Sequence, residues 1–110
     1  MRHYTIDEVT TADVQCMRAY LSEHSERSAI EDLYWLSLPA ELLHGIQVEH
    51  QDCQPYCVAI EVGNHCVKFE LLVRSRTNHR CDCPRYAEPA QREYVIDFAE
   101  NLIRSLGIRT

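Results

Sequence analysis

The sequence is poor in glycine, with only three in 110 residues, and it contains no long apolar run. Gly45, Gly63 and Gly107 lie too far apart to form the Gly-rich loops that bind phosphates. A membrane-spanning helix needs roughly 20 consecutive apolar residues, and no stretch approaches that length. The first residues, MRHYTIDE, also lack the apolar segment of a secretory signal. We therefore expect a cytoplasmic protein without a membrane span or a common nucleotide site.

Lysine is almost absent, because ten of the eleven basic residues are arginine and the remaining one is Lys68. The net charge is -6, which argues against nucleic acid as a partner, since phosphate contacts supply much of that affinity. The charge is uneven: residues 1–70 carry a net charge of -8 and residues 71–110 a net charge of +2.

Four arginines gather in one polar segment of the second part, where Asp82 is the single acidic residue among them: Arg74, Arg76, Arg80 and Arg85. Planar guanidinium groups suit bidentate contacts with carboxylates. The cluster predicts a site for an anion or an acidic partner. The alternative is a solvated loop whose arginines neutralise the acidic remainder of the chain.

Two long helices are predicted near the ends of the chain. The capping pairs Thr5 with Glu8 and Thr10 with Asp13 allow the first helix to begin at residue 6 or 11, and it should end near residue 23. The last helix begins at Pro89 and is closed by Gly107. Its apolar stripe has helical spacing and comprises Val95, Phe98, Ala99, Leu102 and Leu106.

Strands are predicted between the helices. An apolar run predicts a strand at 33–38, and Pro39 then opens a short helix through residue 43. Residues 44–50 fit either a helix or a strand. Alternating residues predict a hairpin of 56–62 with 65–73 around a two-residue Gly63-Asn64 turn, which pairs Ile60 with Val67.

These elements predict a single α+β domain over residues 1–110. Its N-terminal helix is followed by a two- to three-stranded antiparallel β meander, and the C-terminal helix packs on one sheet face.

Six cysteines are unusual in a chain of this length, and a cytoplasmic protein keeps its thiols reduced. Cys16 is predicted to be a small buried residue on the core-facing side of the first helix. The predicted hairpin register separates Cys57 and Cys66 by roughly 13 Å, too far for one metal ion or disulfide. The remaining Cys53, Cys81 and Cys83 enter near the opposite end of the hairpin. They predict a zinc site with His79, His50 or Cys57 as the fourth ligand.

No catalytic motif is present, so we assign no catalytic residue and expect a non-enzymatic protein-interaction module. The last helix has a wide apolar arc, flanked by Ile96 and Ile103, that would suit a homodimer. The first alternative is a zinc-stabilised domain whose arginine-rich loop binds an acidic partner or ligand. The second is a thiol-dependent enzyme or redox protein that uses Cys81 or Cys83.

Overall fold

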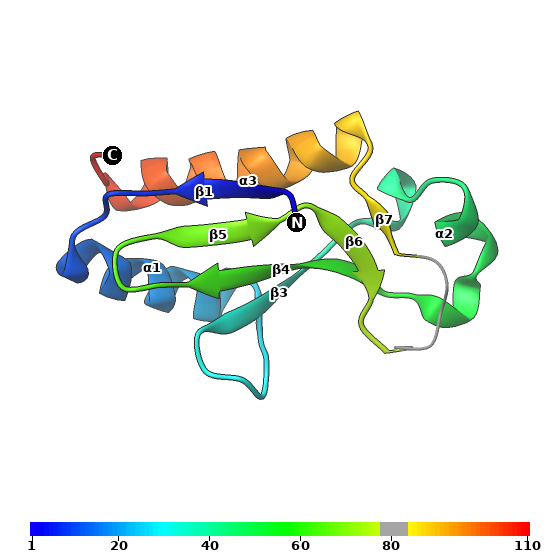
Figure 1. Cartoon of the computed structure of the whole chain (residues 1–110), viewed down its shortest axis with the longest axis horizontal. Coiled ribbons are helices and arrows are strands. Elements are labelled where there is room, and N and C mark those ends of the chain that lie inside the picture. Colours follow the sequence, from blue (N-terminus) through cyan, green and yellow to red (C-terminus); the bar gives the residue numbers. More distant parts are fainter. Residues whose placement is uncertain (78–83) are drawn as a thin grey trace.

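The computed structural model describes residues 1–77 and 84–110 (Figure 1). In this part of the chain, helices and strands alternate irregularly. The α-helices are α1 (Thr11–His24), α2 (Ile46–Glu49) and α3 (Pro89–Leu106), and two 3-10 turns are η1 (Ala40–Leu42) and η2 (Gln51–Cys53). The strands are β1 (His3–Ile6), β2 (Glu26–Arg27), β3 (Leu33–Ser37), β4 (Tyr56–Val62), β5 (Val67–Glu70), β6 (Leu72–Ser75) and β7 (Arg85–Tyr86).

The sheet has seven strands among the described residues, and every neighbouring pair is antiparallel. Its main path runs β1-β5-β4-β3-β2, while β6 pairs with both β4 and β7. The predicted succession of a helix, a two- to three-stranded meander and a helix is therefore wrong. The sheet is larger because the N-terminal segment and several short segments join it.

The N-terminal residues form a strand where a helix start was one alternative. β1 pairs with β5 from His3 opposite Glu70 to Ile6 opposite Val67, so tertiary pairing overrides the local capping signal. The helix begins only at residue 11, where the Thr10 hydroxyl accepts a hydrogen bond of 3.1 Å from the Asp13 N–H. The later of the two predicted starts is thus confirmed.

The hairpin of β4 and β5 exists, but its predicted register is wrong by two residues. Ile60 lies opposite Phe69, and the loop between the strands has four residues, closed by a 2.8 Å bond from the Gly63 N–H to the Cys66 carbonyl. Gly63 lacks the positive φ that a two-residue type II′ turn requires at this position. A shift of two residues keeps every side chain on its predicted face, because side chains alternate with period two.

The second hairpin strand is also interrupted at Leu71. Cys57 lies opposite Arg74 in β6, whereas Ile60 lies opposite Phe69 in β5, so two extra residues are accommodated between them. The Leu71 N–H donates to the Arg2 carbonyl, and the Leu71 carbonyl accepts from the Ala87 N–H. This break lets both the N-terminus and β7 join the sheet.

Between β3 and β4 the chain forms short helical turns. The strand predicted at 33–38 and the short helix after Pro39 correspond to β3 and η1. The segment 44–50, for which helix and strand were both open, contains α2. The left-handed Gly107 (φ 63°) ends α3 as predicted.

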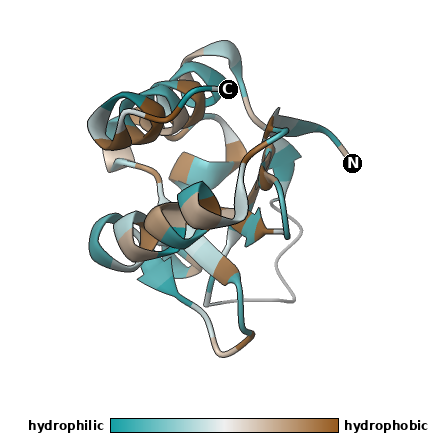
Figure 2. Ribbon diagram, turned by 90° about the vertical axis from the view of Figure 1, so that its left-hand side faces the viewer, coloured by the Kyte–Doolittle hydropathy of each residue, from teal (hydrophilic) through white to brown (hydrophobic). Residues whose placement is uncertain are grey.

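The two long helices cover the same face of the sheet (Figure 2). The core between them and the sheet includes Met17 and Leu21 from α1, Phe69 from β5, and Val95 and Leu102 from α3, all fully buried. The opposite face carries exposed charges such as Glu61 and Lys68. No helix in the described residues is both long enough and apolar enough to cross a membrane.

Candidate functional site

The predicted zinc site falls largely on residues 78–83, since Cys81, Cys83 and His79 lie outside the described residues. Cys53 is buried in η2, with 4% of its surface exposed. The described chain reaches Thr77 beside it, where the Thr77 hydroxyl donates to the Gln54 carbonyl over 3.4 Å. Within residues 1–77 and 84–110 no three His, Cys, Asp or Glu side chains gather closely enough to hold a metal ion. The zinc site stays a prediction.

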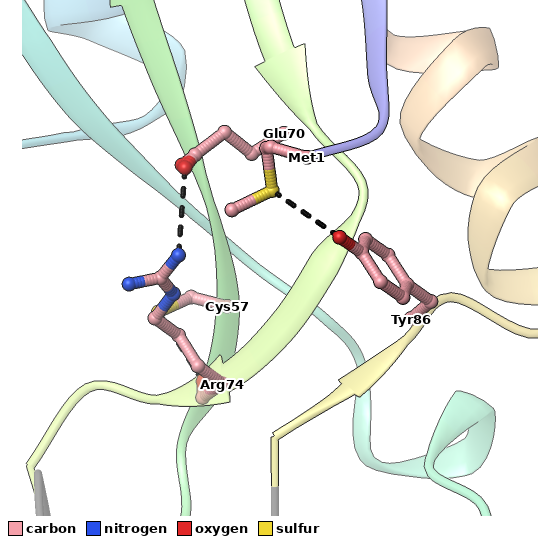
Figure 3. A network of polar contacts seen from close by, with 5 residues as sticks. All are labelled: Met1, Cys57, Glu70, Arg74 and Tyr86. Atoms are coloured by element: carbon pink, nitrogen blue, oxygen red, sulfur yellow. Dashed lines mark hydrogen bonds and ion pairs between the residues drawn. The ribbon is translucent and has the colours of Figure 1, made fainter.

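Cys57, one candidate for the fourth ligand, lies on the sheet face away from the helices, beneath Arg74 (Figure 3). It is fully buried, and its thiol lies 3.7 Å from the Arg74 carbonyl. Burial raises the pKa of Cys57 to about 11, although the Arg74 charge opposes this effect. The thiol is therefore protonated at neutral pH, which makes Cys57 a poor nucleophile and a poor metal ligand.

Cys16 is exposed, so the prediction that it packs in the core is wrong. The buried side of α1 consists of Val14, Met17 and Leu21. Cys16 immediately precedes Met17, and one helical residue rotates the side chain by about 100° around the axis, out of that side.

The described arginines of the predicted anion site bind groups of this chain. Arg74 reaches Glu70 at 3.4 Å (Figure 3), and Arg76 forms an ion pair with Glu26. Arg85 donates to the Pro84 carbonyl over 2.8 Å, and Arg80 lies outside the described residues. Two of the four thus neutralise acidic side chains, as the alternative of a charge-neutralising loop expects. Binding of an external anion there stays a prediction.

The structure forms an aromatic groove along α3 that the sequence patterns did not predict. One hollow of about 400 Å³ lies between α3 and η1, and a second of about 310 Å³ lies at the end of β3. Tyr94 lines both hollows, so they adjoin, and we call them together the α3 groove. The first is lined by Leu42, Ala90, Glu93, Tyr94, Asp97, Phe98 and Asn101. The second is lined by Glu23, His24, Ser25, Glu26, Trp35, Leu36, Ser37 and Tyr94.

The floor of the groove is held by aromatic contacts between α1, α3 and the sheet. Tyr20 meets Phe98 edge-on, with ring centroids 6.1 Å apart, and also lies 4.1 Å from the His24 ring. Phe98 packs in turn on Phe69 of β5, at 6.3 Å. Because Phe98 is anchored on both sides, the half-buried floor keeps its shape without a partner.

The rim of the groove is acidic. Glu93 and Asp97 border the first hollow, and Glu23 and Glu26 border the second, while no lysine or arginine appears among the described residues lining either one. Glu26 is partly neutralised by its ion pair with Arg76. Among the described residues, the only cationic partner of the other three carboxylates is His24, which lies 4.0 Å from Glu23.

Two buried glutamines fix the wall of the groove. The Gln91 amide donates to the Leu42 carbonyl and to the Gln47 side-chain oxygen, both at 2.8 Å, and Gln47 also accepts from the His44 N–H. The Gln91 oxygen accepts from the Glu88 N–H at the start of α3. This network ties η1 and α2 to α3, and so positions Leu42 beside the aromatic floor.

A weak signal for the groove was present in the sequence. Tyr94, Phe98 and Asn101 have the spacing of one helix face, and Glu93 and Asp97 flank them. The other flank of α3, with Ile96 and Ile103, had suggested self-association. Both isoleucines are half-buried.

Comparison with protein-family models, with curated proteins and with solved structures found no match to this chain.

Proposed function

We propose that this protein is a non-enzymatic interaction module whose α3 groove binds a basic amphipathic helix of a partner protein. The observation that carries the proposal is an aromatic floor bordered by carboxylates, with no lysine or arginine among the described lining residues. Apolar side chains of the partner helix would cover Tyr94 and Phe98. Its lysines or arginines would face Glu93 and Asp97.

Charge complementarity favours a basic partner over a second copy of this chain. The whole chain carries a net charge of -6, and the rim adds local negative potential. Such a field steers cationic partners toward the groove and opposes acidic ones. A helix from another copy would have to bring its own acidic residues against this rim.

The length of the groove suits a helix. The α3 lining extends from Ala90 to Asn101, which corresponds to roughly 16 Å along the helix axis. A partner helix of about three turns covers that distance and can present two or three apolar anchors at i, i+4 and i+7.

The test uses two synthetic helical peptides with the same leucine positions, one with lysine and the other with glutamate at the polar positions. Fluorescence anisotropy should show saturable binding of the lysine peptide, weakened by added salt, and none of the glutamate peptide. Replacing Glu93→Gln and Asp97→Asn together should weaken binding roughly three- to tenfold, since each exposed charge contributes less than about 1 kcal/mol.

The matched control replaces Glu49→Gln and Glu61→Gln, two exposed acids that line neither hollow, so both double variants lose two negative charges. Equal weakening by both double variants would show a non-specific charge effect and overturn the proposal. Sedimentation that finds a dimer broken by Tyr94→Ala would instead assign the groove to a second copy.

A further inference from the structure

A second, separate hollow lies apart from the α3 groove. It measures about 800 Å³ and lies between α1 and the loop that joins β2 to β3. Gln15, Arg18 and Ser22 line it from α1, whereas Tyr20 and His24 on the other flank of that helix face the groove. The core side of α1 separates the two sites. Sites for small molecules commonly measure about 300–1,000 Å³.

The loop wall of this pocket is held by hydrogen bonds. The Ser28 hydroxyl donates to the Ile30 carbonyl over 2.9 Å and accepts from the Ile30 N–H over 3.0 Å. The Val62 N–H donates to the Asp32 carbonyl over 2.9 Å, which joins the loop to β4. Asp32 has a left-handed backbone (φ 62°). The wall is therefore formed before any ligand binds.

Arg18 is fixed in the pocket with donors to spare. Its Nε and Nη2 groups donate hydrogen bonds to the two carboxylate oxygens of Asp32, over 2.8 and 3.3 Å. A guanidinium has five N–H donors, so three remain after this pairing. The hydrogen bond to Asp32 raises the pKa of Arg18 above its usual value, and Tyr34 and Glu31 act in the same direction. Arg18 thus stays charged.

Arg27 supplies a second cation to the same pocket. It lies opposite Tyr34 in the β2–β3 pair, and Tyr34 is buried on the helix-covered face, so Arg27 is directed toward α1. Arg27 is exposed and has no hydrogen bond or ion pair with any described residue. Because Asp32 already neutralises Arg18, Arg27 is the cation that an incoming anion would neutralise.

We propose that this pocket binds a small molecule that carries a carboxylate. The carboxylate would lie between the Arg27 guanidinium and the unused N–H groups of Arg18, which match its planar geometry. Gln15 and Ser22 offer further polar contacts, and Leu33 adds apolar surface. Glu31 at the rim disfavours multiply charged anions such as phosphates.

The test compares benzoate with benzamide, and butyrate with butyramide, as probes of the unmodified protein. Each amide keeps the shape of its acid without the charge. Backbone NMR signals of Gln15, Ser22 and Ala29 should shift saturably with the carboxylates, and the amides should bind at least about tenfold more weakly. Arg27→Gln should weaken carboxylate binding about tenfold, which corresponds to about 1.4 kcal/mol.

Arg92→Gln removes an exposed arginine of α3 that lines no described pocket, and it should leave carboxylate binding unchanged. Arg18→Lys keeps a cation beside Asp32 but loses the planar donor pair, so it should weaken binding while the protein stays folded. Equal binding of the amides, an unaltered affinity of the Arg27→Gln variant, or shifts that never saturate would each overturn the proposal. None of these outcomes bears on peptide binding in the α3 groove.

Discussion

Replacing Gln91→Leu tests whether the buried glutamine pair holds η1 and α2 against α3. Gln91 and Gln47 are 1% and 2% exposed. The change removes three hydrogen bonds of Gln91, to the Glu88 N–H, the Leu42 carbonyl and the Gln47 side chain. Each is worth about 1 kcal/mol net, so the free energy of unfolding should fall by about 3 kcal/mol.

The double variant separates the network from simple packing. Gln47→Leu alone removes two bonds, to the His44 N–H and to Gln91, and should cost about 2 kcal/mol. Both single variants lose the same Gln47–Gln91 bond, so the sum of their costs counts that bond twice. The double variant should therefore cost at least about 1 kcal/mol less than the sum of the two single variants.

Urea unfolding followed by circular dichroism measures these differences, with an unchanged m-value showing that only stability has changed. Gln51→Leu is the matched control, because Gln51 is exposed, and it should alter stability by less than about 0.5 kcal/mol. A Gln91→Leu variant as stable as the control, or strict additivity in the double variant, would refute a structural role for the network.

Three further predictions concern the cysteines. At neutral pH, iodoacetamide should modify exposed Cys16 far faster than fully buried Cys57, as mass spectrometry of timed samples can measure; comparable rates would contradict the burial of Cys57. Burial raises the folded-state pKa of Cys57 to about 11 from 9.0, so the unfolded chain loses this proton at a lower pH than the folded protein. The free energy of unfolding should therefore be unaffected by Cys57 below pH 9 and should fall by up to about 3 kcal/mol as the pH rises toward 11. In a pH series of urea titrations, Cys57→Ala should lack this part of the decline. The predicted zinc site requires about one bound zinc per chain and a lower melting temperature after chelation; metal-free protein with unchanged melting, or full zinc content in Cys53→Ser, would exclude it.

Local patterns were sufficient for the elements whose own residues decide them. The spacing of Val95 and Leu102 with Gly107 behind them placed α3, and the apolar run before Pro39 placed β3. Local signals failed where a distant segment competes. The capping pair at Thr5 favoured a helix, but pairing with β5 makes this segment a strand.

The candidate sites depended even more on tertiary contacts. The sequence indicated that Tyr94 and Phe98 lie on α3. It did not indicate that a groove beside them is completed by Leu42, Trp35 and Leu36. The same holds for the polar pocket, since Arg18 and Arg27 belong to different elements and line one pocket in the folded chain, where the pairing of β2 with β3 directs Arg27 toward α1.

By itself, the sequence determined the alternation of faces along β4 and β5, the bounds of α3, and an acidic chain with a scarcity of glycine and lysine. These follow from side-chain periodicity and composition, which do not depend on what a segment packs against. The tertiary structure alone decided the hairpin register, the recruitment of β1 to the sheet, and the burial of Cys57 with the exposure of Cys16. Each of these is a competition between segments far apart in the chain, and only the packed core determines which contact is lower in free energy.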